Sequence, residues 1–182
     1  MHMVSDTIRE ELDKLSPFAR AVLAKVAEIP RGSVRPYWWV AREIGVPRAA
    51  RAVGNALAEN PLPIVIPCHR VVRSDWSLGG YCRVLDSVTK RNLLSDEGVD
   101  LELLGLCNRT RARFCTYPPS EFFCLPTCGA HREEGGRPVL IRDVPFAAGA
   151  GLVPCGTCRP DSGAGSLAVR TGQLSGRRLR LE

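Results

Sequence analysis

The first hundred residues of the chain place apolar side chains at the spacing expected for helices. Between Leu12 and Val26, apolar residues recur every three or four positions, which predicts an amphipathic helix with one buried face. Pro30 breaks this pattern, and Pro36 suits the first turn of a following helix. We therefore expect a mostly helical domain over residues 4–98.

Two short helices are predicted next, one over residues 37–44 and an alanine-rich one over residues 49–59. The segment Gly45-Val46-Pro47 supplies a tight turn between them. Two short helices joined by a turn that contains glycine are typical of a helix-turn-helix motif, whose second helix enters DNA. Packed helix pairs are also common in ordinary cores, so the pattern leaves both interpretations open.

The run from Asn60 to Pro67 is apolar after its first residue and ends in Cys68-His69-Arg70. We expect this run to be buried and to present Cys68 as a nucleophile. His69 can accept or polarise the thiol proton, and Arg70 adds positive charge, so the thiolate fraction rises. A single cysteine in an apolar run can also be an inert core residue.

Beyond about residue 99 the composition changes to Gly, Pro, Arg and Cys, and a segment of this kind cannot build a large core unaided. Cys124 and Cys128 form a CxxxC pair, and Cys155 and Cys158 form a CxxC pair. Paired cysteines at these spacings predict one tetrahedral Zn²⁺ site whose metal contributes folding energy. Two disulfides are the alternative.

The remaining segment, residues 162–182, combines glycines with arginines. This composition predicts a disordered basic tail, with a weak phosphate-binding arm as the alternative.

The formal net charge of +6 and the pI of about 9.1 suit a polyanionic partner, although many proteins without one are equally basic. The chain is long enough for one ordinary domain or two small ones. Its first residues lack the apolar core of a signal peptide, and no apolar run is long enough to span a membrane. We expect a cytoplasmic monomer without a membrane partner, and reducing conditions favour metal binding by clustered cysteines.

Several separated motifs between Leu15 and Gly98 resemble the O6-alkylguanine-DNA alkyltransferases. In chain order they are Gly32-Ser33-Val34, Tyr37, the segment 49–54, the Cys68 run, Gly79-Gly80-Tyr81, Leu93-Leu94 and Glu97-Gly98. The resemblance implies a winged helix-turn-helix domain that transfers alkyl groups from O6-alkylguanine in double-stranded DNA to Cys68, once per molecule. It further implies that His69 works through a bridging water, oriented by Glu97, and that no cofactor serves this site.

The same resemblance implies a DNA-binding set. Its members are Tyr37, Ala49, Arg51, Asn60, Ser74 and Tyr81. By this resemblance Arg51 enters the duplex where the damaged base has rotated out, because sulfur can reach the alkyl carbon in line only on an extrahelical base. Tyr37 would promote that rotation, and Asn60 would brace the turn before Cys68.

The chain departs from the family pattern in the loop after Tyr81, which begins with Cys82, and at Trp76, where a small residue is usual. Relatives that have lost the cysteine only bind lesions. The alternative is therefore a non-catalytic lesion-binding or regulatory protein, which binds alkylated DNA without repairing it.

The segment from Phe114 to Asp161 resembles the zinc-binding domain of Ada-type proteins. The motifs are residues 123–128, residues 150–155 and Cys158-Arg159-Pro160-Asp161. The resemblance implies a small α+β domain over residues 108–161 whose Zn²⁺ is held by the four cysteines. It also implies that Cys124 accepts methyl groups from DNA methylphosphotriesters. A purely structural zinc knot that adds DNA affinity is the alternative.

Overall fold

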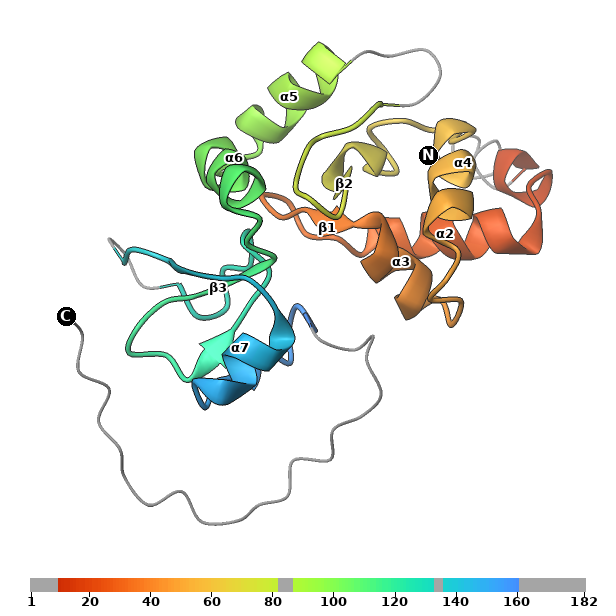
Figure 1. Cartoon of the computed structure of the whole chain (residues 1–182). Coiled ribbons are helices and arrows are strands. Elements are labelled where there is room, and N and C mark those ends of the chain that lie inside the picture. The colour runs from red at the N-terminus through yellow and green to blue at the C-terminus, as the bar shows by residue number, and fades with distance from the viewer. Residues whose placement is uncertain (1–9, 82–86, 133–135, 161–182) are drawn as a thin grey trace.

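The computed structural model of the protein describes residues 10–81, 87–132 and 136–160, coloured in Figure 1. The predicted basic tail and Cys82 lie outside these ranges. A mostly helical first module (residues 10–99) precedes a second module of short strands and a short helix (residues 112–160), and helices dominate the described part of the chain, as expected. The division into two domains stays a prediction. No helix in the described ranges has the length and apolar character needed to cross a membrane.

Helix α2 (Pro17–Ala27) forms the base of the first module. It begins later than the apolar pattern suggested, because the Ser16 side chain accepts a hydrogen bond from the Ala19 N–H and Pro17 occupies the first helical position. Its buried residues are Ala19, Val22, Leu23 and Val26. The predicted apolar face is thus confirmed from Ala19 onward.

Helices α3 (Tyr37–Glu43) and α4 (Ala50–Ala58) pack against each other and against α2. Gly45 lies in the turn between them at a φ of +81°, a left-handed conformation that glycine adopts without steric cost. The two-helix unit therefore has the bounds that the sequence predicted, to within one residue at each end.

A short parallel ladder connects this helical unit to Cys68. Strand β1 (Arg35–Pro36) pairs with β2 (Val71–Val72), with Arg35 opposite Val71. The 3₁₀ turn η1 (Cys68–Arg70) comes directly before β2. Helices α5 (Ser87–Asp96) and α6 (Leu101–Thr110) follow, and α6 leads toward the second module (Figure 1).

The expectation that the whole run before Cys68 is buried is wrong for two residues. The side chains of Ile64 and Val65 are 62% and 66% exposed. The run makes a tight turn in which the Ile66 N–H bonds to the Leu62 carbonyl, and Ile64 adopts a φ of +78°. A turn of this kind leaves its tip in solvent, whereas Asn60 at its start and Ile66 and Pro67 at its end are buried.

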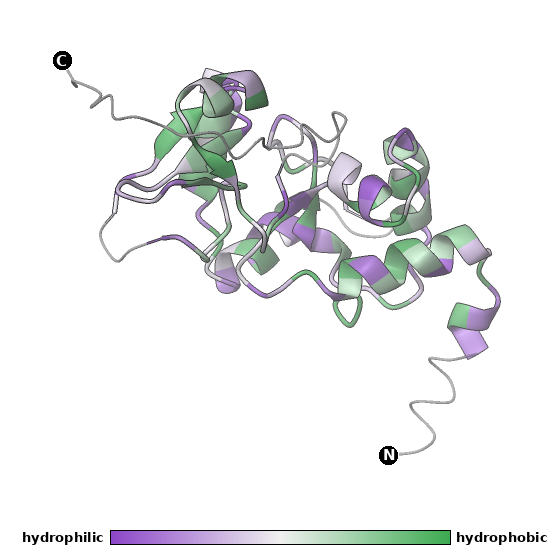
Figure 2. Ribbon diagram, turned by 90° about the horizontal axis from the view of Figure 1, so that it is seen from below, coloured by the Kyte–Doolittle hydropathy of each residue, from purple (hydrophilic) through white to green (hydrophobic). Residues whose placement is uncertain are grey.

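The second module is built from short strand pairs and one short helix. Strand β3 (Phe114–Thr116) pairs antiparallel with β5 (Val139–Ile141), and β4 (Phe122–Phe123) pairs parallel with β6 (Val153–Pro154). Helix α7 (Val144–Gly149) begins at Asp143, whose side chain accepts a hydrogen bond from the Phe146 N–H. Hydropathy colouring shows mainly hydrophobic strands in this module, whereas α2 alternates between hydrophobic and hydrophilic residues (Figure 2).

The two modules are joined by hydrogen bonds between segments far apart in sequence. The Thr127 hydroxyl lies 2.8 Å from the Val34 nitrogen, whose N–H it accepts, and 3.2 Å from the Val34 carbonyl oxygen. The Ser33 hydroxyl donates to the Thr127 carbonyl at 3.0 Å, and the Trp39 indole donates to the Cys158 carbonyl at 2.8 Å. We call this set of contacts the seam.

Trp76 extends this connection to the beginning of the second module. Its indole N–H donates to the Ala112 carbonyl at 3.0 Å, and its side chain is buried. The Trp76 backbone has a φ of +69°, a conformation that costs a non-glycine residue roughly 1–2 kcal/mol. This conformation explains why a small residue suits the position, and the buried indole explains how tryptophan can occupy it.

We expect Trp76→Gly to be more stable than Trp76→Ala by about 1 kcal/mol, because only alanine retains the backbone strain after the indole is lost. Both variants should be less stable than the wild type by about 3 kcal/mol or more. Denaturant unfolding measures these differences. Asn92, exposed within α5, is the control position, where alanine should be the more stable residue by about 1 kcal/mol. An advantage of alanine at position 76 would contradict the strain argument.

Candidate functional site

Cys68 begins the η1 turn and is 5% exposed. The buried Asn60 side chain donates from Nδ2 to the Cys68 sulfur at 3.2 Å and to the Ile66 carbonyl at 3.1 Å. Its Oδ1 accepts the Leu62 N–H at 3.0 Å. Asn60 therefore ties the two ends of the turn together and directs an N–H at the sulfur, a contact that favours the thiolate over the thiol.

His69 and Glu97 form the pair that the resemblance implied. His69 Nε2 lies 2.9 Å from Glu97 Oε1, and His69 is 2% exposed. Burial lowers the pKa of His69 despite its hydrogen bond to Glu97, so the ring is neutral at neutral pH. An ionised carboxylate only accepts hydrogen bonds, so Nε2 carries the proton and Nδ1 is left as an acceptor. Among the described residues, none forms a hydrogen bond with Nδ1.

Arg70 holds Glu97 in this position. Its Nε lies 3.1 and 2.8 Å from the two Glu97 oxygens, and its Nη2 lies 2.6 Å from Oε1. Burial alone would raise the pKa of Glu97, but the hydrogen bonds from Arg70 and His69 outweigh it and lower that pKa. Glu97 is thus kept ionised, as an orienting group for His69 must be.

Lys90 was not predicted from the sequence and is the notable addition to the site. It lies on α5, is 1% exposed, and donates from Nζ to the Val71 carbonyl at 2.5 Å and the Gly80 carbonyl at 3.3 Å. Burial lowers the pKa of Lys90 to about 8, while the nearby Cys68 thiolate opposes that shift. Nothing in the sequence around this lysine predicted its burial, because the carbonyl groups that accept its hydrogen bonds lie 10 and 19 positions away.

Several predicted DNA-binding residues meet in one open cleft of about 780 Å³. Its lining includes Tyr37, Arg51 and Ser74 of the predicted set, together with Trp38, Ala50, Gly54, Asn55, Arg73, Asp75 and Gly80. Burial raises the pKa of Tyr37, and the Cys68 thiolate adds to this. Arg51 is exposed on α4.

The other members of the predicted set lie around this cleft. Ala49 is half-buried immediately before α4. Asn60 is inside the turn described above. Tyr81 is 5% exposed and meets the His69 ring edge-on, with 6.1 Å between ring centroids.

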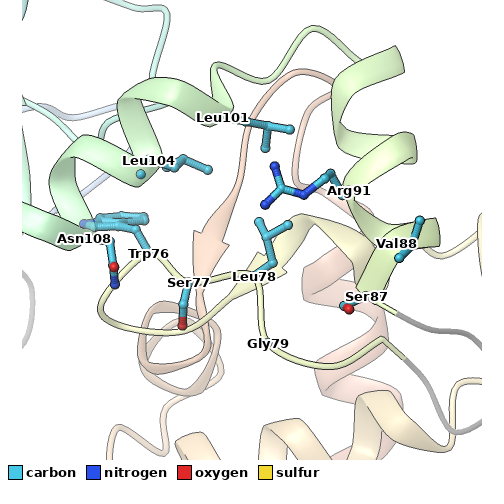
Figure 3. Close-up of a pocket in the computed structure, with 11 residues that line it drawn as sticks. Trp76, Ser77, Leu78, Gly79, Ser87, Val88, Arg91, Leu101, Leu104 and Asn108 are labelled. Carbon is cyan, nitrogen blue, oxygen red and sulfur yellow. The ribbon is translucent and has the colours of Figure 1, made fainter.

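A second cavity of about 360 Å³ lies between α5, α6 and the loop that contains Trp76. The Arg91 side chain points between Leu78 and Leu101 (Figure 3). None of the residues predicted for catalysis, DNA binding or metal binding lines this cavity.

The four cysteines of the second module form a separate candidate metal centre. The sulfurs of Cys124, Cys128, Cys155 and Cys158 all lie within 4.8 Å of one another, and all four residues are buried. Hydrogen bonds from Cys124 and Cys158 lower the pKa of the Cys128 thiol, whereas the hydrogen bond to Cys128 raises that of Cys124. Four adjacent buried sulfurs cannot all ionise without a cation between them, so the donor set fits a thiophilic divalent metal.

The other buried cysteines behave as ordinary thiols. Burial raises the pKa of Cys107 to about 11 and that of Cys115 to about 12. Both remain protonated at neutral pH and are poor nucleophiles.

The pH dependence of stability tests the burial of Lys90. Between pH 8 and the unfolded pKa near 10.5, the unfolded chain binds the proton and the folded chain does not, so stability rises with pH. Relative to Lys90→Met, the wild type should gain about 2–3 kcal/mol between pH 7 and pH 10. The measurement is urea unfolding of both proteins at each pH. Lys14→Met, at a side chain that is 67% exposed, should show no such gain, and an equal gain in both pairs would rule out a buried Lys90.

Comparison with known proteins identifies the first module. Residues 17–99 match the family described as 6-O-methylguanine DNA methyltransferase, DNA binding domain. The methylated-DNA–protein-cysteine methyltransferase of Methanosarcina barkeri is 49% identical over 77 residues, which cover 40% of this chain and 49% of that protein. The protein of the same name from Methanothermobacter thermautotrophicus is 50% identical over 85 residues, covering 47% and 46% respectively. The chain thus spans about half the length of these curated relatives.

A crystal structure of Mycobacterium tuberculosis OGT in complex with DNA is 38% identical, with a TM-score of 0.44, and the match covers 50% of this chain and 55% of that one. The family match ends at residue 99, so the Ada-type resemblance of the second module stays a prediction. The segment from residue 17 to residue 99, which carries Cys68, His69 and Glu97, belongs to the family of 6-O-methylguanine DNA methyltransferase DNA-binding domains.

Proposed function

We propose that this protein repairs alkylated DNA directly, by moving the alkyl group from O6 of guanine to its own Cys68. The observation that carries the proposal is the setting of Cys68, which receives a hydrogen bond from Asn60 and lies beside a neutral His69 oriented by an ionised Glu97. A nucleophile, a base and an orienting carboxylate are what thiol activation requires.

DNA would bind to α3 and α4, which would form the helix-turn-helix motif of a winged domain. The exposed Arg51 on α4 would occupy the space that the damaged base leaves in the stack. Unstacking costs a few kcal/mol and is cheapest for a lesion that pairs badly, which favours alkylated guanine over intact bases. Tyr37 and Ser74 line the cleft into which the base would turn.

Cys68, His69 and the guanine base account for every proton and electron pair in the proposed transfer. The Cys68 thiol proton would pass to His69 Nδ1 through a bridging water, and the thiolate would attack the alkyl carbon. As the sulfur–carbon bond forms, the carbon–O6 bond breaks and its electron pair stays on guanine, which takes up the proton from His69. The thioether is stable, so each molecule would act once.

For the second module we propose a single Zn²⁺ bound by the four cysteines. Zinc would supply the folding energy that short strands and one short helix lack. Transfer from methylphosphotriesters to Cys124 stays a prediction, because the Cys124 side chain is 1% exposed and the seam packs beside the centre. That burial favours the structural role of the metal.

Transfer to Cys68 can be measured by intact mass and peptide mapping after the protein is mixed with duplex DNA containing one O6-methylguanine. We expect the Cys68 peptide to gain one methylene and the DNA to lose it, because the thiolate is the acceptor. Cys68→Ala should still bind the lesion but gain nothing. An unmodified wild-type protein that binds the lesion selectively would instead support the non-catalytic alternative.

Metal binding is tested by elemental analysis and by the sulfur-to-metal charge-transfer absorption of the Co²⁺-substituted protein. The wild type should bind one equivalent of Zn²⁺, and Cys158→Ser should lose it, because three sulfurs no longer close the tetrahedral site. Cys107→Ser changes an equally buried thiol outside the centre and should retain the metal. Loss of the metal in Cys107→Ser, or retention in Cys158→Ser, would contradict the four-cysteine assignment.

A further inference from the structure

Arg35 is a buried charge in the first module whose role the proposed chemistry does not explain. It lies on β1 and is 4% exposed. Its Nη1 donates to the Val34 carbonyl at 2.9 Å, and its guanidinium lies 5.4 Å from the centre of the Trp39 ring. A cation this deeply buried is costly unless negative charge lies close to it.

The structure does not offer a carboxylate for this purpose. Among the described residues, Arg35 forms no ion pair with Asp or Glu, and Glu43, at the end of α3, pairs with Arg42 and Arg159. The aromatic face of Trp39 provides only a weak attraction.

The seam brings the residues on either side of Arg35 into contact with the segments that carry the four cysteines. Val34, which precedes Arg35, exchanges hydrogen bonds with Thr127, and Thr127 is the neighbour of the ligand Cys128. Trp39, which lies under the guanidinium, donates to the carbonyl of the ligand Cys158. Burial lowers the pKa of Arg35, and Cys158, Cys128, Cys155 and Cys124 are the groups that oppose this shift.

We propose that Arg35 is the buried counter-charge of the four-cysteine centre, supplied to the second module by the first. The inference rests on the metal centre proposed above. Four thiolates around one divalent ion leave a net double negative charge, of which the guanidinium neutralises half. Arg35 is thus a positioning residue for the metal: it favours the fully ionised set of sulfurs without touching the ion.

Linkage makes this effect reciprocal. If Arg35 strengthens metal binding, the bound metal must equally stabilise the arrangement that keeps Arg35 in place. Arg35 is opposite Val71 in the β1–β2 ladder, and β2 continues directly from the Cys68 turn. Metal in the second module should therefore hold the ladder beside the nucleophile of the first.

The experiment compares the full-length wild type with Arg35→Met, Arg35→Lys and Arg31→Met. Zn²⁺ affinity is measured by competition with a chromophoric chelator, and unfolding is measured with and without Zn²⁺. We expect Arg35→Met to bind Zn²⁺ at least tenfold more weakly and Arg35→Lys to recover most of the loss. Arg31→Met, which removes an exposed arginine from the turn before β1, should bind Zn²⁺ as the wild type does.

Stability without metal separates the charge effect from lost packing. Metal-free Arg35→Met should be at least as stable as the metal-free wild type, because an uncompensated buried charge has been removed. With Zn²⁺ bound, the same variant should be less stable than the wild type. Hydrogen exchange at the Val71 and Val72 amides should slow when the wild type binds Zn²⁺.

Two results would overturn the inference, and they are distinguishable from failure of the metal centre. Equal Zn²⁺ affinity of the wild type and Arg35→Met would remove the counter-charge role while leaving the centre intact. Equal destabilisation of Arg35→Met with and without Zn²⁺ would reduce Arg35 to a packing residue. A wild type that binds no Zn²⁺ would overturn the metal centre itself, and the inference with it.

Discussion

The Cys68 site depends on one carboxylate, that of Glu97. It accepts hydrogen bonds from Arg70 through both of its oxygens and a further one from His69. Arg70 also donates to the Ile29 carbonyl at 2.6 Å, just beyond the end of α2. Glu97, which follows α5, is therefore linked through Arg70 of the η1 turn to the segment that follows α2. Without this charge, Arg70 would lose its ion pair and His69 its fixed tautomer.

The second constraint on the structure is the seam, which holds the two modules together. It matters because each module is small and has a limited core of its own. The first module contributes backbone and side-chain groups from Ser33 to Trp39, and the second contributes Thr127 and Cys158. At the edge of the seam, Arg42 donates to the Arg159 carbonyl at 2.6 Å, and Arg113 lies 5.8 Å from the Trp38 ring. Trp38 also lines the cleft of Arg51. The second module is thus in contact with the elements that would meet DNA, although its own cysteines face inward.

Local patterns in the sequence were enough to predict the two-helix unit and the grouping of four cysteines. Each of these depends on spacing within a few residues or on a motif that carries its own geometry. The seam was not predicted, because it joins Val34 to a threonine 93 positions later and Trp39 to a carbonyl 119 positions later. Lys90 and Arg35 were missed for the same reason: a charged residue in a sequence looks solvated until the fold shows what covers it. The prediction for Ile64 and Val65 was wrong in the opposite direction: their apolar side chains suggested burial, but they form the exposed tip of a turn.

Burial alone does not distinguish a nucleophilic cysteine from a structural one, because Cys68 at 5% exposure and Cys124 at 1% are both largely covered. What differs is the nature of the surrounding groups. Cys68 has an amide N–H on its sulfur and a neutral imidazole next to it in the chain, and Tyr37, whose pKa its thiolate raises, lines an open cleft. Cys124 is surrounded by three other sulfurs and belongs to a centre against which the first module packs. By the proposals above, ionisation in the first setting would create a reactive group for an outside substrate. In the second it would create a ligand whose charge a metal and Arg35 would offset. A cysteine side chain would thus act as a nucleophile at one position and as a metal ligand at the other, because the fold surrounds the two sulfurs with different charged groups.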